Sequence, residues 1–176
     1  MTRVLKAWPR LSLVIVALLG ALLVGTTAAL AVSVTKTGKT VRAVKVVTES
    51  GATSTTSSTF VDMAVMSLTM TVPSGEQGLF VIEFSGSGTC TEIAPTNATA
   101  FCDVMIQVDN SAAAPPGDVV WLQAANGTSS SFHAESFTFV SGPLNAGSHR
   151  FDVQFRSLNG SFHFADRSLM VMRTTV

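Results

Sequence analysis

Apolar and polar residues alternate along most of the chain beyond residue 59. In the segments 68–72, 104–108 and 151–155, every second residue is aliphatic, aromatic or methionine. Successive side chains of a strand point to opposite faces, so this pattern predicts strands with one buried face. Segment 79–82 is apolar at every position, which predicts a strand covered on both faces. No stretch keeps the spacing of an amphipathic helix over a helix length.

Turn-forming residues separate these segments. Pro73–Glu76 predicts a turn, and Gly86–Gly88 is expected to end the strand that begins near residue 79. Asn159–Gly160 lies between two phenylalanine-rich segments, 151–156 and 162–164, and predicts a hairpin. This succession of about eight short strands predicts an all-β fold, an antiparallel β-sandwich of jelly-roll type.

The first 31 residues have the three parts of a secretory signal peptide. Three basic residues precede an apolar run from 11 to 24, and the small residues Ala29 and Ala31 suit a cleavage site. We therefore predict a hydrophobic N-terminal signal helix and an exported protein, secreted or held in the cell envelope.

The alternative to cleavage is a membrane anchor formed by residues 11–34. That stretch is just long enough to cross a bilayer, which needs roughly 20 apolar residues. Lys36, Lys39 and Arg42 follow it, and positive charge on that side opposes an anchor whose N-terminus stays inside. Cleavage is therefore the preferred interpretation.

The mature chain divides at about residue 58. Val41–Val47 is rich in β-branched residues and favours an early strand. The Ser- and Thr-rich run 48–59 has little apolar surface to bury, so it is predicted to be a linker or exposed loop. We therefore expect a signal peptide at 1–31, an N-terminal strand and linker at 32–58, and a β-sandwich domain at 59–176.

The charge balance changes once the leader is set aside. The chain has 11 Lys and Arg residues against 11 Asp and Glu residues, and three of the basic ones belong to the leader. Eight basic and eleven acidic residues remain, a net charge of −3. Beyond residue 46 the basic residues are scattered arginines, so the composition argues against nucleic-acid binding.

Cys90 and Cys102 are the only cysteines of the chain. In an exported protein, two cysteines predict a disulfide bond. Closing a loop of this length stabilises a protein by roughly 2–3 kcal/mol in the chain-entropy account. A metal-binding pair is the alternative, but no further ligands stand at zinc-like spacing.

Four segments carry a resemblance to a known group of proteins. They are the loop bracketed by Cys90 and Cys102, followed by residues 102–109, 144–149 and 166–171. On these segments, and on the strand and turn pattern of 59–176, the chain resembles uncharacterised exported bacterial proteins with a jelly-roll-like β-sandwich. The resemblance implies a fold and a bacterial origin, and it brings no activity and no functional residues.

The candidate catalytic groups do not form a recognisable constellation in the sequence. No serine stands in a G-x-S-x-G motif, and the paired cysteines are expected to be oxidised. His133 and Glu135 would share one face of a strand, and His163 could join them on a divalent metal if the strands were neighbours. The alternative is a solvent-facing row of polar side chains. We therefore expect no enzymatic activity, with a metal-dependent hydrolase as the remotest alternative.

Two further binding sites are candidates. Asp109, Asn110 and Asp118 flank a proline-containing loop and offer the oxygen ligands that calcium prefers. Trp121 could be the stacking platform of a carbohydrate-binding module. Its apolar neighbours favour a place in the core instead.

Self-association is the other option for a partner. Sandwiches of the tumour-necrosis-factor type are similar in architecture and form trimers through apolar strand faces. Leu79–Ile82 and four methionines could line such a face here, although burial within one copy explains them equally well: Met63, Met66, Met170 and Met172. The sequence thus predicts a non-catalytic secreted or cell-envelope protein with a structural or binding role. Its partner would be an unknown extracellular ligand or another copy, and the alternative function is carbohydrate binding.

Overall fold

A computed structural model describes residues 36–92, 98–115, 118–125 and 129–176. The predicted signal peptide and the alternative anchor lie outside the described residues. Among the described residues, no helix is long and apolar enough to cross a membrane.

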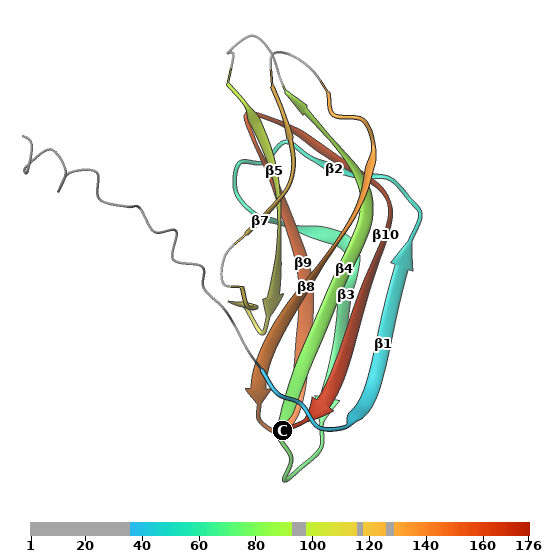
Figure 1. The fold of residues 1–176 in the computed structure, drawn as a ribbon, viewed down its shortest axis with the longest axis vertical. Coiled ribbons are helices and arrows are strands. Elements are labelled where there is room, and N and C mark those ends of the chain that lie inside the picture. Colours follow the sequence, from blue (N-terminus) through green and yellow to red (C-terminus); the bar gives the residue numbers. More distant parts are fainter. Residues whose placement is uncertain (1–35, 93–97, 116–117, 126–128) are drawn as a thin grey trace, which may run out of the picture. The chain divides into compact units, whose positions relative to one another are not determined.

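The described part of the chain is all-β, and its strands form two antiparallel sheets (Figure 1). The strands are β1 (Val41–Glu49), β2 (Thr53–Thr55), β3 (Val61–Val72), β4 (Gly78–Glu92), β5 (Ala100–Val108), β6 (Ser111–Ala112), β7 (Val119–Ala124), β8 (His133–Leu144), β9 (Gly147–Leu158) and β10 (Gly160–Thr175). Sheet A has the order β1-β10-β4-β8, with β2 also paired to β10. Sheet B has the order β3-β9-β5-β6, with β7 also paired to β5.

The strand pairs are nested along the chain. β1 pairs with β10, β3 with β9, β4 with β8 and β5 with β7, all antiparallel. The chain is therefore a long antiparallel ribbon whose successive strand pairs lie alternately in sheet A and sheet B. In Figure 1 the strands of sheet A lie side by side in front of β3 and β9.

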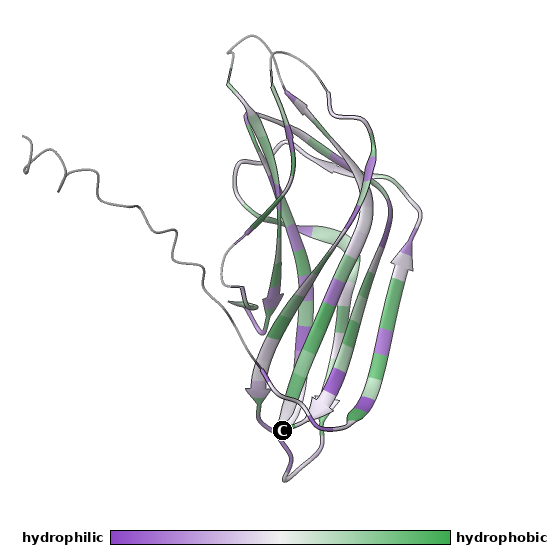
Figure 2. Ribbon diagram, viewed as in Figure 1, coloured by the Kyte–Doolittle hydropathy of each residue, from purple (hydrophilic) through white to green (hydrophobic). Residues whose placement is uncertain are grey.

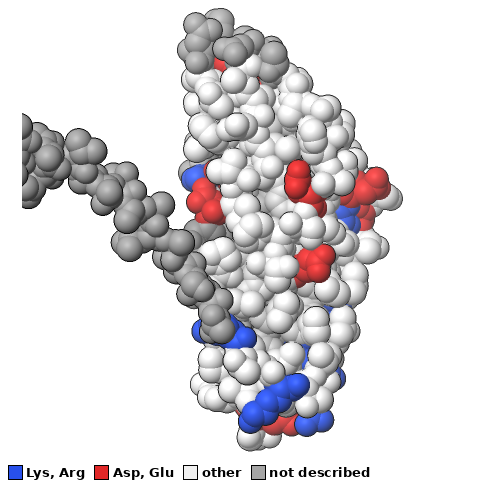
Figure 3. All heavy atoms as spheres, viewed as in Figure 1, with Lys and Arg blue, Asp and Glu red and all other residues white. Residues whose placement is uncertain are grey.

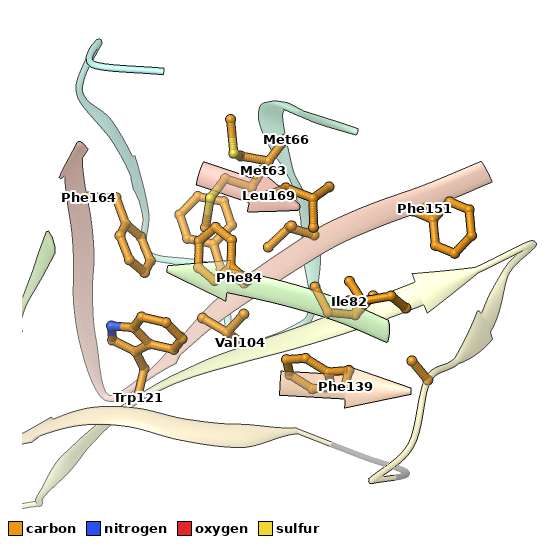
Figure 4. Close-up of a cluster of buried hydrophobic side chains, with 14 of the residues drawn as sticks. Met63, Met66, Ile82, Phe84, Val104, Trp121, Phe139, Phe151, Phe164 and Leu169 are labelled. Atoms are coloured by element: carbon orange, nitrogen blue, oxygen red, sulfur yellow. The ribbon is translucent and has the colours of Figure 1, made fainter. Parts of the chain in front are cut away.

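The core lies between the two sheets and is dominated by phenylalanine. Phe84, Trp121 and Phe164 form its aromatic centre, with ring centroids 5.2 to 5.7 Å apart (Figure 4). Such pairs contribute about 0.5–1.5 kcal/mol each beyond the burial of their area. Met63 and Met66 of β3 are also buried here, so these two methionines are core residues and cannot line an exposed interface.

The predicted disulfide is confirmed. Cys90 at the end of β4 is bonded to Cys102 of β5, and both side chains are fully buried. Because β4 belongs to sheet A and β5 to sheet B, the bond ties the two layers of the sandwich together.

Strand β4 continues where the sequence predicted an end. It runs through Gly86 and Gly88 to Glu92 because aromatic rings of β10 pack directly over the glycines. A Cβ atom on Gly86 would lie 3.0 Å from Cε1 of Phe164, which leaves little room for a side chain. The glycines therefore permit close packing instead of terminating the strand.

The sandwich also begins earlier than the predicted boundary at residue 59. The expected strand over Val41–Val47 is present as β1, and the Ser/Thr-rich run contributes β2. Both strands pair with β10, so residues 41–55 belong to sheet A. The Ser/Thr-rich composition indicated a linker because the run has little apolar surface to bury. Residues 53–55 nevertheless form strand β2, because they pair with the distant strand β10.

A turn is present at Asn159–Gly160 between β9 and β10, and Asn159 has a φ of 61°. The predicted hairpin is wrong, because β9 belongs to sheet B and β10 to sheet A, so the chain crosses from one sheet to the other at this turn. The segments around Phe162–Phe164 and Leu169–Arg173 are parts of one strand, β10, with an irregularity between Phe164 and Arg167. This long strand lies in the middle of sheet A and pairs with β1, β2 and β4.

Candidate functional site

Trp121 lies in the core and offers no exposed ring. Its side chain packs against Phe84 and Phe164, and the residue is 7% exposed. A sugar-stacking platform needs an open aromatic face, so Trp121 does not serve as one. A carbohydrate site would have to use other residues.

The three candidate metal ligands do not converge. His133 and Glu135 lie on β8 and His163 on β10, with β4 between the two strands. His133 pairs with Gly88 of β4 and His163 with the next residue, Thr89, so the two histidines point to opposite faces of sheet A. Among the described residues, no group of three His, Cys, Asp or Glu side chains could hold a metal ion.

The two carboxylates among the three candidate calcium ligands are separated in the fold. Asp118 precedes β7 and binds the guanidinium of Arg156, whereas Asp109 follows the end of β5 and binds His149. Each carboxylate therefore has its own cationic partner, and the pair forms no shared oxygen site.

His149 is held by acceptors on both sides of its ring. Its Nδ1 lies 2.6 Å from Oδ2 of Asp109, and its Nε2 lies 2.8 Å from the carbonyl oxygen of Asn145. Burial of the ring disfavours its charge, but both hydrogen bonds and the charge of Asp109 outweigh burial and raise the pKa of His149. Both ring nitrogens can donate only in the imidazolium form, so the geometry fits a protonated His149.

The same contacts act on Asp109. Burial favours its neutral form, but His149 and the backbone N–H of Arg150 hold its pKa below the ordinary value of 3.8. The pair ties the turn after β5 to the start of β9. The sequence marked Asp109 as a calcium ligand, and its partner 40 residues away could not be identified from spacing.

A second ion cluster ties β5 to β9. Nε of Arg156 donates to Oδ2 of Asp103 at 2.9 Å, its Nη2 binds Asp118, and the guanidinium lies over the ring of Phe60. Burial and the neighbouring Asp118 carboxyl raise the pKa of Asp103 against the lowering effect of Arg156. Asp103 is 2% exposed and closed to a ligand. The cluster therefore stabilises the contact between β5 and β9.

The surface that remains open is the outer face of sheet A, the side turned away from sheet B. Residues paired across neighbouring strands share a face, so the strand register defines its rows. The apolar row is Val44, Met172, Val81 and Val140. The mixed row above it is Val46, Met170, Glu83 and Thr138. The hydroxyl row follows with Thr48, Ser168, Ser85 and Ser136.

The apolar row is partly open to solvent. Val44 is 51% exposed, whereas Met172, Val81 and Val140 are half-buried. In the mixed row, Val46 is 56% exposed and Met170 is half-buried. In Figure 2, β1 is mostly green and interrupted by purple. Of the residues suggested by sequence for an interface, Met170, Met172 and Val81 lie on this face, whereas Phe80 and Ile82 point into the core.

The lower end of the face, where β1 and β4 begin, is covered by the chain itself. The backbone of Lys39 and Thr40 is hydrogen-bonded to Thr175 at 2.9 and 3.0 Å. Leu79 lies on the outer side of β4, two residues before Val81, and is nevertheless 4% exposed. The uncovered surface therefore begins at the apolar row.

A groove of about 660 Å³ opens at the upper end of the face. Its floor includes Ser85 and Ser168 of the hydroxyl row, whose Oγ atoms are 2.9 Å apart. Glu49, Glu135 and Asp166 also border it, although the register puts Glu49 and Glu135 in the row of Gly86 and Arg167, on the side that faces sheet B. Arg167 also borders the groove, but its guanidinium is turned inward and donates to backbone carbonyls of Gly51, Ala165 and Ala64.

Charged residues lie at both ends of the face. Lys36, Lys39 and Arg42 lie toward the lower end, together with Glu76, which binds Arg173. Figure 3 shows several blue side chains with red atoms beside them at the lower end, and several red patches, two of them next to blue ones, over the upper half. Of the acidic residues toward the upper end, Glu83 belongs to the mixed row of the face, and Glu49, Glu135 and Asp166 border the groove. The chain was also compared with known proteins, and neither the models of known families nor the curated proteins give a match.

Proposed function

We propose that this chain is a non-catalytic protein of the cell exterior or envelope that binds a macromolecular partner through the outer face of sheet A. The observation that carries the proposal is the partly exposed apolar row, Val44, Met172, Val81 and Val140. It crosses the four main strands of the sheet without a polar interruption. Contiguous exposed apolar surface with a polar rim is typical of interaction sites.

Export is supported by the leader at 1–31 and by the Cys90–Cys102 bond. Disulfides persist in oxidising compartments and are rare in the cytosol. The same leader supports the secreted form over the form anchored by residues 11–34.

A jelly-roll topology is the finer description that we propose for the sandwich. It is supported by the nested pairs β1–β10, β3–β9, β4–β8 and β5–β7, because wrapping such a ribbon places alternate pairs in opposite sheets. The resemblance to exported bacterial jelly-roll proteins agrees with this proposal and with export.

The titratable groups with shifted pKa values support a non-catalytic role. His149, Asp109 and Asp103 each bind a charged partner that joins two elements of the fold. Shifted groups of this kind stabilise structure, whereas catalytic groups line a cleft where substrate can reach them.

A photo-crosslinking residue placed at Val46 tests the proposal. The full chain, with its leader, is produced in a bacterium that exports it, and adducts are analysed by mass spectrometry. We expect a discrete adduct from position 46 and none from Thr71, an exposed position on β3 of sheet B. No adduct at 46, or equal labelling at both positions, would refute an interaction through this face.

Carbohydrate binding is a second candidate, now centred on the groove and no longer on Trp121. The hydroxyl row and three carboxylates offer donors and acceptors for sugar hydroxyls in a groove of suitable size. Binding of the exported protein to a glycan array, and its loss in a Glu135→Gln/Asp166→Asn variant, would support it. An array without a bound glycan would exclude it.

A further inference from the structure

We infer that the first half of strand β8 binds an extended peptide segment of another protein, which adds a strand to sheet A and carries a basic residue two positions from an apolar one. The inference goes beyond the proposed function, because it concerns the backbone edge of β8 and not the outer face of the sheet.

The first observation is the direction of the backbone groups along β8. This strand is an edge of sheet A, and its register with β4 is unbroken over residues 133–141. Val140 and Ala114 exchange two backbone hydrogen bonds of 2.8 Å on the side away from β4. The N–H and C=O of a strand residue point to the same side, and the side alternates from residue to residue. Three further residues therefore direct their backbone groups away from β4: Ala134, Ser136 and Thr138.

This stretch of edge is open. Ala114 covers β8 at Val140, but among the described residues no backbone group is hydrogen-bonded to the outward groups of 134–138. The opposite side of the sandwich is bridged, because Nζ of Lys45 in β1 lies 2.7 Å from the carbonyl oxygen of Thr69 in β3. An open backbone edge is a template for one more strand.

A small apolar hollow lies beside the open edge. It measures about 160 Å³, and its lining includes Val119, Val120 and Trp121 of β7 and Phe137 of β8. Val120 is 56% exposed and Phe137 is 36% exposed, although the register places Phe137 on the side of Phe84 that faces sheet B. Pockets for small molecules measure about 300–1,000 Å³, so this hollow suits one side chain of a bound peptide.

Glu135 determines which strands can be added. It lines the same hollow and forms no ion pair with any described residue. A charge on an edge strand disfavours pairing with a strand that leaves it unneutralised. Strand β8 contains no lysine or arginine, so pairing with β8 of a second copy would leave Glu135 without a cation. The charge therefore favours a basic segment of a different protein.

The spacing within the bound segment follows from strand pairing. Residues opposite each other on neighbouring strands share a face. A peptide side chain opposite Phe137 enters the hollow, and the one two positions away lies opposite Glu135. The first is apolar and the second is lysine or arginine, with outward-facing residues between them.

The test selects a displayed library of random ten-residue peptides against the full exported chain. We expect the enriched peptides to alternate apolar and polar residues and to carry lysine or arginine two positions from an apolar residue. A bound peptide should slow hydrogen exchange at the amides of Ala134, Ser136 and Thr138. It should leave the amide of Thr71, on β3 of sheet B, unchanged.

Three variants separate backbone pairing from other causes. Ser136→Pro removes an N–H that points away from β4 and should raise the dissociation constant of an enriched peptide at least about tenfold. Ser136→Ala keeps that N–H, removes only the hydroxyl and should bind like the wild type. Glu135→Lys should weaken binding of the same peptide and select peptides with aspartate or glutamate at the basic position. Thermal unfolding of each variant verifies that it is folded.

Several outcomes would overturn the inference. One is a library without enriched peptides, and another is peptides that bind Ser136→Pro as tightly as the wild type. A third is enriched peptides that need no basic residue. Self-association of the chain that Ser136→Pro abolishes would instead assign this edge to a second copy.

Discussion

The hydrogen-bonded pair of His149 and Asp109 makes the stability of the sandwich depend on pH. An Asp109→Asn substitution tests this dependence, because it keeps the size of the side chain but removes its charge. In the wild type, Asp109 accepts from Nδ1 of His149 and from the backbone N–H of Arg150. The variant keeps a carbonyl acceptor at this position but loses the attraction between opposite charges.

The expected magnitude follows from exposure. A hydrogen bond between charged groups contributes about 1.5–3 kcal/mol when it is shielded. The His149 side chain is 12% exposed, but that of Asp109 is 44% exposed, so solvent screens the pair. We therefore expect a loss of about 1 kcal/mol in the free energy of unfolding at pH 6.

The sign follows from the direction of each pKa shift. The pKa of His149 is raised above 6.5, so its contribution is complete below pH 6.5 and is lost as pH rises through the folded-state pKa. The pKa of Asp109 is lowered below 3.8, so its contribution is present above pH 3.8 and is lost as pH falls through its folded-state pKa. The stabilising effect is thus fully present from pH 3.8 to 6.5.

Urea unfolding, followed by the fluorescence of Trp121, measures the effect at pH 5, 6, 7, 8 and 9. The difference between wild type and Asp109→Asn should shrink as pH rises through the alkaline half of this series. His163→Gln, which removes an exposed histidine beside the hydroxyl of Ser161, is the matched control and should follow the wild type. A difference that stays constant from pH 5 to pH 9 would refute the reasoning.

Three predictions concern the core and the disulfide. Phe84→Ala should lower the free energy of unfolding by about 3–5 kcal/mol in urea denaturation because it leaves a cavity between the sheets, and a loss below 1 kcal/mol would contradict the packing. Replacing both Cys90 and Cys102 with alanine should cost about 2–3 kcal/mol, and reductant should then leave the variant's unfolding curve unchanged while shifting that of the wild type. Gly86→Val should cost about 1–3 kcal/mol in thermal or urea unfolding because its side chain would meet Phe164, and a neutral effect would show that the rings of β10 do not pack there.

Much of the local structure could be predicted from the chain. Period-two alternation identified β3, β5 and β9 because one face of each strand is buried and the other is not. Asn159–Gly160 identified the turn between β9 and β10 because asparagine tolerates positive φ, but the two strands enter opposite sheets and do not form the predicted hairpin. Export and the cysteine count together predicted the bond between Cys90 and Cys102.

The predictions that failed depended on distant partners. Gly86–Gly88 indicated a strand end because glycine weakens strands, yet Phe162 and Phe164 of β10 pack against these positions and β4 continues. The Ser/Thr-rich run indicated a linker, yet β2 gains backbone hydrogen bonds from β10. In each case the deciding contact comes from a strand more than 70 residues away.

The sequence by itself determined the strand content, the compartment that we propose and the cysteines available for pairing, because these depend on local pattern and composition. Only the tertiary structure decided which strands are neighbours and in what register, and therefore that His133 and His163 lie on opposite faces. It also decided that Val44, Met172, Val81 and Val140 form one row on an open face. The alternation of apolar and polar residues shows that successive side chains point to opposite sides of a strand. Only the long-range pairing between strands determines which of those sides is covered by the other sheet.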